Sequence, residues 1–382
     1  MGDGGKIVLV ITDLEMGGSP RWLRDLAVGL KRDWGWRVDV IALKALPVGG
    51  ISSGKTIAEQ LQEAGISVRT LGIRGAWGFW RGRRALRRIL AESGAEIVYS
   101  VLVHANVLTA LAMKGIDKAR RPRFVQGIHT LQRRPGWHWR ALGWAAKFGD
   151  AMIVPSGAVL ERVKRYGRVR EGVVIPNGID VERFARAIRV ETVPWPEGAK
   201  VVGYVGRFDR VKQLDLLIRA AGLIEAVHLA MVGYGAEEGR LRALAEQLGI
   251  QTRVHFVEAT AEPERWYPRF TCVCLPSEEE GFGLVLVEAM AAGVPVVAMD
   301  TVVTREIVRT GVDGILVEPP GSPERFAEAL ARVLGIGGVA PFSPTVPPGE
   351  GKSTGERVAE RFSVGGMVTR HREFFNKIRE SR

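Results

Sequence analysis

Two glutamates in the second half of the chain lie in or next to strongly apolar sequence. Glu280 stands before the turn GFG (281–283), and Glu288 lies eight residues later in the apolar run LVLVEAMAAG. An ionised carboxylate is almost never buried without a partner. Glu288 therefore either faces solvent on a mostly buried helix or meets a polar group. Two neighbouring ribose hydroxyls are one such group, and an Arg or Lys of the same chain is another.

Two cations in the segment VGRFDRVK (205–212) could bind phosphate. Arg207 follows the strand-like run KVVGYVG (200–206) at once, and Lys212 stands five residues further on, before an amphipathic helical segment. Ligands of parallel α/β sheets bind at the carboxyl ends of the strands, where two cations can hold a diphosphate. Either residue alone could also be ordinary solvated surface charge.

The apolar run after GFG predicts a helix that begins near Phe282–Leu284. The first amides of a helix have no partner within the helix, and the positive end of its dipole lies there. The backbone of Gly281, Phe282, Gly283 and Leu284 is therefore a predicted site for phosphate or a sugar hydroxyl.

Two further candidates lie in the first half. Gly17 and Gly18, in MGGSPRWLRDLA, follow the first strand pattern and open a helix, which would let a ligand approach the backbone; a tight turn explains them equally well. His129, in GIHT, lies at the end of another strand pattern, a position that favours a functional histidine over an ordinary one.

The segment GGISSGKT (49–56) satisfies the formula of a phosphate-binding P-loop, with Lys55 and Thr56 at its end. The strand pattern RVDVIAL (37–43) ends several residues earlier, whereas a P-loop turns directly off its strand. Nucleotide binding by Gly49–Thr56 therefore stays an alternative hypothesis, and a surface loop is the favoured interpretation.

Short apolar runs alternate with helical segments along the whole chain, which predicts parallel sheets covered on both faces. The expected strands are 6–11, 37–43, 96–102, 123–128, 151–156, 200–206, 227–233, 253–258, 271–276, 294–299 and 314–319. We expect two doubly wound domains, 1–188 and 198–336, separated by an aperiodic, proline-bearing seam near 186–198. A flexible linker is expected at 337–356, and a C-terminal helix, 357–382, is expected to pack on the first domain.

Charge is unevenly distributed along the 382 residues. The net charge is +12, yet residues 1–190 hold 32 Lys and Arg against 16 Asp and Glu, for example in RGRRALRRIL (81–90). This asymmetry is typical of a polyanionic partner or an anionic membrane, although solvated helix faces could produce it too. No apolar run is long enough to span a bilayer. The two cysteines, Cys272 and Cys274, are expected to be reduced core thiols, because residues two apart on one strand are poorly placed to bridge.

These motifs together resemble the family-4 retaining glycosyltransferases of GT-B fold, also described as glycosyl transferases group 1. The resemblance covers nearly the whole chain, with the GG pair, GIHT, PNGID (176–180), GRF with Lys212, and Glu280 with Glu288 in family order. One motif departs: TVVTREIV keeps an acid, Glu306, but lacks the two glycines before it. The implied fold is two Rossmann-like domains that face each other across a cleft, the first for the acceptor and the second for the nucleotide-sugar.

The resemblance also assigns roles. Arg207 and Lys212 would hold the diphosphate, Glu280 the donor sugar and Glu288 the ribose. Backbone amides of Gly281, Phe282, Gly283 and Leu284 would face sugar and phosphate, Gly17 and Gly18 would close on the phosphates, and His129 would lie close to the reacting sugar. The implied reaction is hexosyl transfer to an acceptor hydroxyl with retention of anomeric configuration.

The expected partners are a nucleotide-diphosphate sugar and an acceptor glycan or lipid-linked precursor, in envelope polysaccharide, lipopolysaccharide or glycolipid synthesis. No cofactor and no metal are expected, since Arg207 and Lys212 can supply the positive charge. We expect a cytoplasmic protein, with peripheral attachment to the inner membrane face left open and nucleic acid disfavoured. The alternatives are a P-loop NTPase, a nucleic-acid or membrane-binding module with a vestigial donor site, and an epimerase or phosphorylase of the same fold.

Overall fold

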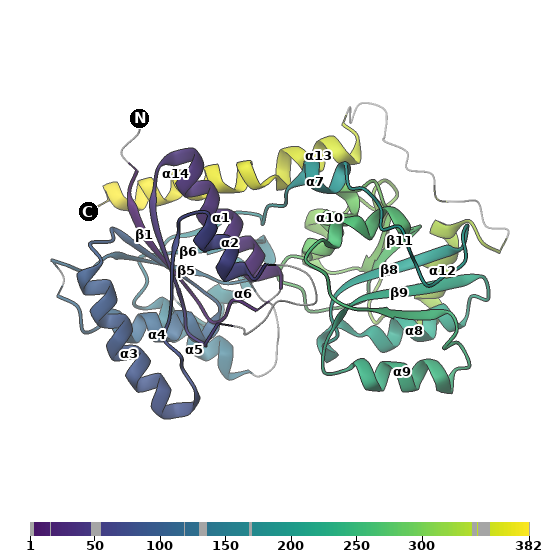
Figure 1. Cartoon of the computed structure of the whole chain (residues 1–382), viewed down its shortest axis with the longest axis horizontal. Helices are drawn as coiled ribbons and strands as arrows, with labels where there is room; N and C mark the ends of the chain where they lie inside the picture. The colour runs from purple at the N-terminus through teal and green to yellow at the C-terminus, as the bar shows by residue number, and fades with distance from the viewer. Residues whose placement is uncertain are drawn as a thin grey trace. The chain divides into compact units, whose positions relative to one another are not determined.

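The chain forms two compact units. The structure is a computed structural model that describes residues 4–15, 17–46, 55–117, 119–129, 136–167, 170–337, 342 and 352–381. The first unit runs to Gly178 and resumes at Val364, and the second comprises Ile179–Ser363 (Figure 1). The chain thus passes from one unit to the other at 178/179, before the seam expected at 186–198. Most of the linker expected at 337–356 lies outside the described residues.

The first unit is built on a parallel sheet with the strand order β3-β2-β1-β4-β5-β6-β7. Its described strands are β1 (Lys6–Ile11), β2 (Arg37–Ala42), β3 (Ser67–Thr70), β4 (Ile97–Val101), β5 (Arg123–Gly127), β6 (Ala151–Val154) and β7 (Gly172–Val174). The order reverses between β1 and β4, so the sheet is doubly wound, as the alternation of apolar runs predicted. The strands β3 and β7 were missed by the sequence analysis because they are short, lie at the sheet edges and bury little.

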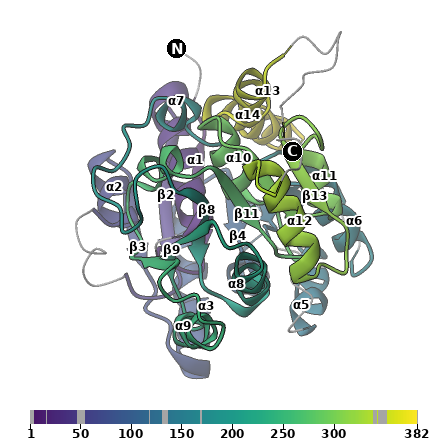
Figure 2. The ribbon, with the colours of Figure 1, turned by 90° about the vertical axis from the view of Figure 1, so that its right-hand side faces the viewer.

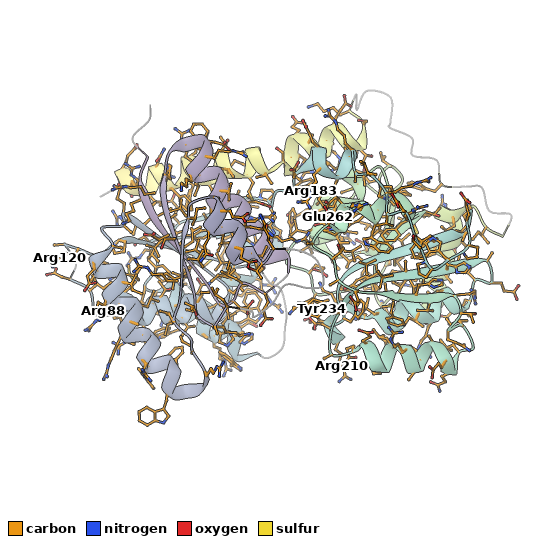
Figure 3. All side chains as sticks on the ribbon, viewed as in Figure 1. Arg88, Arg120, Arg183, Arg210, Tyr234 and Glu262 are labelled. Atoms are coloured by element: carbon orange, nitrogen blue, oxygen red, sulfur yellow. The ribbon has the colours of Figure 1, made fainter. Side chains whose placement is uncertain are left out.

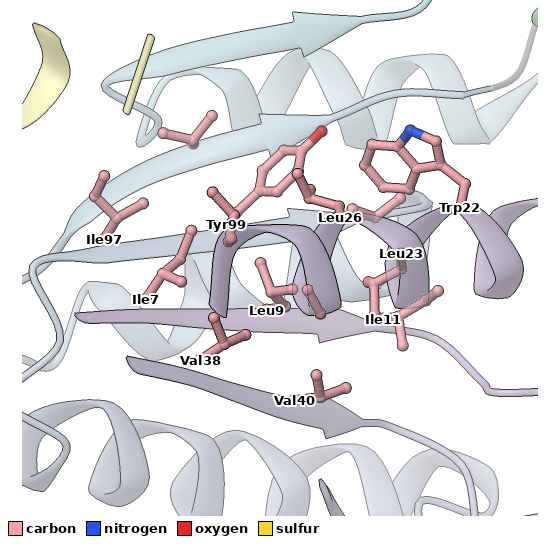
Figure 4. Close-up of a cluster of buried hydrophobic side chains, with 14 of the residues drawn as sticks. Ile7, Leu9, Ile11, Trp22, Leu23, Leu26, Val38, Val40, Ile97 and Tyr99 are labelled. Atoms are coloured by element: carbon pink, nitrogen blue, oxygen red, sulfur yellow. The ribbon is translucent and has the colours of Figure 1, made fainter. Parts of the chain in front are cut away.

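Helices cover both faces of this sheet. They are α1 (Gly18–Trp34), α2 (Ile57–Glu63), α3 (Gly75–Glu92), α4 (Val103–Met113), α5 (Trp137–Ala146), α6 (Gly157–Lys164) and α14 (Val364–Glu380). One core joins α1, α2 and α14 to the sheet, and a second joins α3 and α4 to the opposite face. Figure 4 shows Trp22, Leu23 and Leu26 of α1 lying on Ile7 and Leu9 of β1. Burial of each such side chain stabilises the fold by about 1.5–3 kcal/mol.

The second unit has a parallel sheet with the order β10-β9-β8-β11-β12-β13. The strands are β8 (Lys200–Arg207), β9 (Val227–Tyr234), β10 (Val254–Val257), β11 (Cys272–Leu275), β12 (Val296–Met299) and β13 (Gly314–Val317). Each was expected from an apolar run, with ends that differ by one or two residues. This sheet reverses its order between β8 and β11.

The helical elements of the second unit are α7 (Val181–Ala185), η1 (Arg210–Lys212), α8 (Leu214–Gly222), α9 (Glu238–Gln247), η2 (Pro263–Arg265), η3 (Tyr267–Arg269), α10 (Leu284–Ala291), α11 (Val302–Ile307), α12 (Pro323–Leu334) and α13 (Thr354–Phe362). Figures 1 and 2 place α8 and α10 on opposite sides of the sheet. The helices α8 and α12 pack together, and α10 packs with α7 and α13. The second sheet is therefore covered on both faces.

The C-terminal segment contains two helices where the sequence analysis expected one. The helix α13 belongs to the second unit, and only α14 packs on α1 of the first unit. The break falls at Ser363, whose extended backbone (φ −71°, ψ 147°) forms an isolated bridge with Ile179. The two points where the chain passes between the units are thus neighbours.

The described residues also test the expectations about membrane-spanning segments and about the two cysteines. No described helix has the length and apolar character needed to cross a bilayer. Cys272 and Cys274 are buried and unbridged on β11, as expected. Burial raises the pKa of the Cys272 thiol to about 12 and raises that of Cys274 as well, so both stay protonated.

Candidate functional site

The candidate site of the second unit lies where its sheet reverses direction. The strand β8 pairs with β9 on one side and with β11 on the other, and the strands beyond them lead away in opposite directions. The loops that leave the carboxyl ends of β8 and β11 therefore separate at this point, which is where ligands of open α/β sheets bind. These two loops carry Arg207, Lys212 and Glu280.

Lys212 and Glu280 are in direct contact. Nζ of Lys212 lies 2.6 Å from Oε1 of Glu280, and Oγ of Ser277 donates a hydrogen bond of 2.6 Å to the same oxygen. Glu280 is 8% exposed, so its charge is compensated by a cation and a hydroxyl rather than by solvent. The contact joins the loop after β8 to the loop after β11.

A strained turn sets the position of Lys212. Lys212 ends η1, and the next residue, Gln213, has φ 51° and ψ 42° before α8 begins at Leu214. A non-glycine residue in this left-handed region is uncommon and persists only where its surroundings hold it. Here the strain accompanies a lysine that points at a buried carboxylate.

Arg207 lies at the end of β8 and is more open to solvent than Lys212. Its side chain is 56% exposed, and Nη2 lies 2.8 Å from Oδ2 of Asp209. The hydroxyl of Tyr204 donates to the carbonyl oxygen of Arg207 over 2.9 Å. Burial and the charges of Glu280 and Asp209 raise the pKa of Tyr204 well above its ordinary value, so this phenol remains a donor.

The strand ends beneath this loop approach too closely for side chains. A Cβ added to Gly233 of β9 would lie 1.9 Å from the carbonyl oxygen of Gly206 of β8. Real Cβ atoms do not come that near a backbone oxygen, so glycine at 233 is required for the two strand ends to pair as they do.

The helix α10 begins where the sequence predicted. Gly283 has φ 86° and ψ 53° and precedes Leu284, the first residue of the helix. Phe282 is 5% exposed and packs edge-on against Phe362 with ring centroids 5.7 Å apart. The glycines on either side of Phe282 thus let its ring anchor the turn, which fixes the first amides of α10 beside Glu280.

Glu288 proves to be buried, not solvent-facing. It is 3% exposed, and Oε2 accepts a 2.5 Å hydrogen bond from the hydroxyl of Tyr267, which is itself 0% exposed. A tyrosine hydroxyl is thus one polar group that meets Glu288, whereas the sequence suggested ribose hydroxyls or an Arg or Lys.

The departing motif around Glu306 has a local explanation. Thr301 caps α11, and its side chain and that of Thr304 satisfy each other's backbone amides in a capping box. Glu306 lies on this helix, and its carbonyl oxygen accepts from Arg361 over 3.0 Å. Val302 and Val303 thus stand where the family pattern has its two glycines, and the capping threonines flank them.

The remaining predicted residues belong to the first unit. Gly17 has extended backbone (φ 177°) and precedes Gly18, the first residue of α1, just beyond the end of β1. His129 follows β5, at the same carboxyl edge of the sheet. Both groups lie at the ends of strands, the position that the sequence analysis expected.

His129 sits in a cluster of buried polar atoms. The centroid of its ring lies 4.3 Å from the ring centroid of Trp22. The side chain of Asn177 lies beside the imidazole without reaching good hydrogen-bond geometry. Both ring nitrogens are buried with no hydrogen-bond partner among the described residues, as is Nε2 of His371 on α14. Burial, helped by the charge of His371, lowers the pKa of His129 from 6.5 to about 3, so the imidazole is neutral at neutral pH.

The P-loop alternative gains no support from its described part. Nζ of Lys55 lies 2.6 Å from Oε1 of Glu63 on an exposed surface, and Thr56 caps α2 through a capping box with Glu59. Residues 49–54 of the motif lie outside the described residues. Lys55 and Thr56 thus have structural partners, whereas a P-loop needs them at phosphate and metal.

Four residues of these sites could not be predicted from the sequence. Ser277 and Asp209 were close to the predicted residues but carried no pattern of their own, and Tyr267 lies twenty-one residues from Glu288. His371 on α14 could not be connected with His129 by any spacing. In the described chain, no group of three or more His, Cys, Asp or Glu residues is arranged to hold a metal ion.

Comparisons with known families match both halves of the chain. The model of Glycosyltransferase Family 4 matches residues 16–183, and that of Glycosyl transferases group 1 matches residues 186–337. D-inositol 3-phosphate glycosyltransferase 1 of Catenulispora acidiphila is 34% identical over 273 residues, which are 67% of this chain and 62% of that protein. Phosphatidyl-myo-inositol mannosyltransferase of Mycobacterium tuberculosis is 36% identical over 170 residues, 43% of this chain and 44% of that protein. The chain thus matches less than two thirds of the length of either relative.

Solved structures share the fold. The Anabaena protein Alr3699/HepE, crystallised in complex with UDP and glucose, superimposes with a TM-score of 0.80 at 22% identity. The match covers 98% of this chain and 100% of that one. The two parallel sheets therefore form the GT-B fold.

Proposed function

Because the chain belongs to glycosyltransferase family 4, we propose that it transfers a sugar from a nucleotide-diphosphate sugar to an acceptor hydroxyl. The observation that carries the proposal is the contact of 2.6 Å between Lys212 and Glu280, at the point where the second sheet reverses its strand order. It places a cation, a carboxylate and the start of α10 in one small region of the second unit. A diphosphate and a sugar need those three kinds of partner.

In the proposed donor site, Lys212 and Arg207 neutralise the diphosphate. The backbone amides of Gly281 to Leu284 lie in the turn that leads into α10, and the start of that helix adds the positive end of its dipole. This arrangement favours the transition state, in which negative charge accumulates on the departing diphosphate. Because these groups are cationic already, the proposed reaction requires neither a metal ion nor a cofactor.

The two glutamates are proposed to bind hydroxyl groups. Glu280 takes hydroxyls of the donor sugar while Lys212 and Ser277 hold its carboxylate in place. Glu288 binds the ribose hydroxyls. The Tyr267 hydroxyl, which donates to Oε2 of Glu288 over 2.5 Å, then either turns away or remains bound to the same carboxylate. A carboxylate has two oxygens and about four lone-pair positions, so one tyrosine does not exhaust its capacity.

Gly17, Gly18 and His129 of the first unit are also given proposed roles. Gly17 and Gly18 offer backbone amides at the start of α1 to the phosphates. His129, neutral because its pKa is about 3, acts as a hydrogen-bonding group towards the reacting sugar and not as an acid with a proton to lose near pH 7.

The proposed chemistry retains the anomeric configuration. The bond between the anomeric carbon and the phosphate oxygen breaks, and the acceptor oxygen bonds to the same face of that carbon. The acceptor proton passes to the departing phosphate oxygen. No protein nucleophile takes part in this route, and the cations of the donor site supply the stabilisation.

The proposed acceptor carries phosphate or is linked to a lipid, in the synthesis of an envelope polysaccharide, lipopolysaccharide or glycolipid in the cytoplasm. Support comes from the relatives named after D-inositol 3-phosphate and phosphatidyl-myo-inositol. The excess of Lys and Arg in residues 1–190 also suits an anionic acceptor.

A screen of nucleotide-sugars tests the proposal. UDP-glucose and GDP-mannose are each added to the protein and its melting temperature is followed, because a ligand of the native state raises it. The active donor is then combined with myo-inositol phosphate, and the anomeric configuration of the product is read by NMR. Failure of every nucleotide-sugar to raise the melting temperature would overturn the proposal, and an inverted product would overturn its stereochemistry.

A further inference from the structure

One face of α3 combines tryptophan and arginine side chains that contribute nothing to the core. Trp77, Trp80, Arg84 and Arg88 follow one another at spacings of three and four residues and therefore share a face of the helix. Trp77 is 86% exposed and Trp80 is 55% exposed. Arg81 and Arg87 flank the same stripe, which we call the α3 face: residues 77, 80, 81, 84, 87 and 88.

The opposite side of α3 is the one that packs. Leu86 and Leu90 are 0% and 1% exposed and belong to the second core of the first unit. The core side of α3 is thus formed by leucines, and Trp77 and Trp80 lie on the side that faces away from the core. An exposed indole costs solvation free energy, so two on one stripe indicate a surface that meets something other than water.

The α3 face continues into a hollow lined by arginines. Arg84, Arg87 and Arg88 line it from α3, and Arg120 lines it from the segment that follows α4; the volume is about 640 Å³. Figure 3 shows Arg88 and Arg120 on the same side of the first unit. Two acids, Glu92 and Asp117, also line the hollow, so the arginines remain in excess.

The surroundings of the arginines in the hollow include a glycine and lack ion-pair partners among the described residues. A Cβ added to Gly115 would lie 2.7 Å from Cδ of Arg87 and 2.9 Å from Nη1, so the glycine makes room for that side chain. None of the four guanidinium groups forms an ion pair with another described residue. Elsewhere in the described residues arginines do pair with neighbouring acids, as Arg305 does with Asp300.

The hollow is remote from Gly17 and His129 of the first unit, whereas Trp77 and Trp80 lie at the other end of α3, which follows β3. The C-terminal end of α3 leads into β4, and the segment after α4 leads into β5, so the hollow lies at the amino-terminal edge of the sheet. Gly17 and His129 lie at the carboxyl edge. The arginines of the hollow are therefore not part of the site described above.

We propose that the α3 face, together with Arg120, docks the first unit on a bilayer that contains anionic phospholipid. Guanidinium groups bind lipid phosphates through paired hydrogen bonds, and indoles prefer the interface between headgroups and acyl chains. From Trp77 to Arg88 the stripe is about 16 Å long, at 1.5 Å per residue, so it can lie along a membrane surface. A single-stranded nucleic acid would need rings spaced along the basic groove, whereas here both rings lie at one end.

The test uses vesicles and does not depend on enzymatic activity. The full-length protein is sedimented with vesicles of phosphatidylcholine alone or of phosphatidylcholine with phosphatidylglycerol. Wild type binds only the anionic vesicles. The pair Arg84→Gln and Arg88→Gln weakens binding by roughly tenfold or more, because each cation near an anionic surface contributes about 1 kcal/mol. The pair Trp77→Ser and Trp80→Ser weakens it comparably.

Matched controls separate docking from general charge and folding. Arg219 and Arg332 are exposed arginines on helices of the second unit, and changing both to Gln removes the same charge; Leu223→Ser removes an exposed apolar side chain there. These controls bind as wild type does, and all variants keep the wild-type melting temperature and its rise with a nucleotide-sugar. The proposal is contradicted if wild type binds both kinds of vesicle equally, or if the control variants lose as much vesicle binding as the α3 variants. It is also contradicted if the arginines are needed for binding an RNA oligonucleotide and not for binding vesicles.

Discussion

Lys212 contacts Glu280 across 68 residues of sequence, with Nζ 2.6 Å from Oε1. One partner lies in the loop after β8 and the other in the loop after β11, so the contact closes the point where the second sheet reverses. Ser277 donates to the same oxygen over 2.6 Å. The contact is thus a small network that holds a cation beside the start of α10.

Removing the cation tests its role in the reaction. In the proposed mechanism Lys212→Gln lowers kcat by about 10²- to 10³-fold, the cost of deleting one group that stabilises transition-state charge. The same variant loses about 1–3 kcal/mol of stability, because Glu280 keeps its buried charge without its cation. Initial rates and urea unfolding measure the two effects separately.

Lys55→Gln is the matched control for that experiment. It removes an exposed lysine that pairs with Glu63, with side chains 64% and 54% exposed. Exposed pairs contribute about 0–1 kcal/mol, so stability and kcat remain near wild type. A large loss of activity on this change would favour the P-loop alternative.

Tyr267→Phe tests the partner of Glu288. The change removes the hydroxyl that donates to Oε2 and leaves the ring in place. We expect a loss of about 1 kcal/mol of stability, the usual net value of one hydrogen bond. If Glu288 binds the ribose, KM for the nucleotide-sugar changes while kcat stays within a few-fold; an unchanged KM together with normal folding contradicts that role.

The two buried histidines predict a dependence of stability on pH. The folded-state pKa values of about 3 for His129 and about 4 for His371 lie below the ordinary 6.5. Between these values the unfolded chain binds more protons than the native state, so stability is complete above pH 6.5 and falls as the pH drops towards 4. Each histidine contributes a slope of up to about 1.4 kcal/mol per pH unit in that window.

Urea unfolding at several pH values between 7 and 4 measures that slope. His371→Gln flattens it by about the share of one histidine, while Lys55→Gln leaves it unchanged. The pH–rate profile should also lack an ionisation of His129 near 6.5. A slope unaffected by His371→Gln would contradict the burial of a neutral imidazole there.

A pair of glycine substitutions tests the packing beneath the donor loop. Gly233→Ala places a Cβ 1.9 Å from the carbonyl oxygen of Gly206, and we expect a loss of about 3 kcal/mol or failure to fold. Gly239→Ala is the control, since nothing lies within 4 Å of its Cβ. That change in α9 is expected to be neutral or stabilising by about 0.5 kcal/mol. Thermal unfolding distinguishes the two.

Much of the fold could be predicted because its signals are local. The central strands of both sheets are buried on both faces, so each appears as a short apolar run, and GFG marked the start of α10. The strands β3 and β7 carry no such run because they lie at the edges. The break between α13 and α14 was also missed: Gly365 and Gly366 follow it in the sequence, but they lie within α14 and not at the break.

The candidate site could be predicted only in part, for a physical reason. Patterns identified Arg207, Lys212, Glu280 and Glu288, which stand beside recognisable turns. Their partners depend on how distant segments pack: Tyr267 meets Glu288 through η3, and His371 approaches His129 because α14 returns to the first unit. Contacts of that kind leave no periodic trace in a sequence.

Titration calorimetry with a nucleotide diphosphate tests the central claim most directly. UDP and GDP are titrated into wild type and into the Lys212→Gln and Arg207→Gln variants, with Lys55→Gln as the control. The account predicts that one nucleotide binds wild type and the control alike, and that the Lys212 variant binds it at least about tenfold more weakly, since a charge-assisted contact contributes about 1.5–3 kcal/mol. Equal affinity in wild type and the Lys212 variant, or a loss confined to the Lys55 variant, would contradict it.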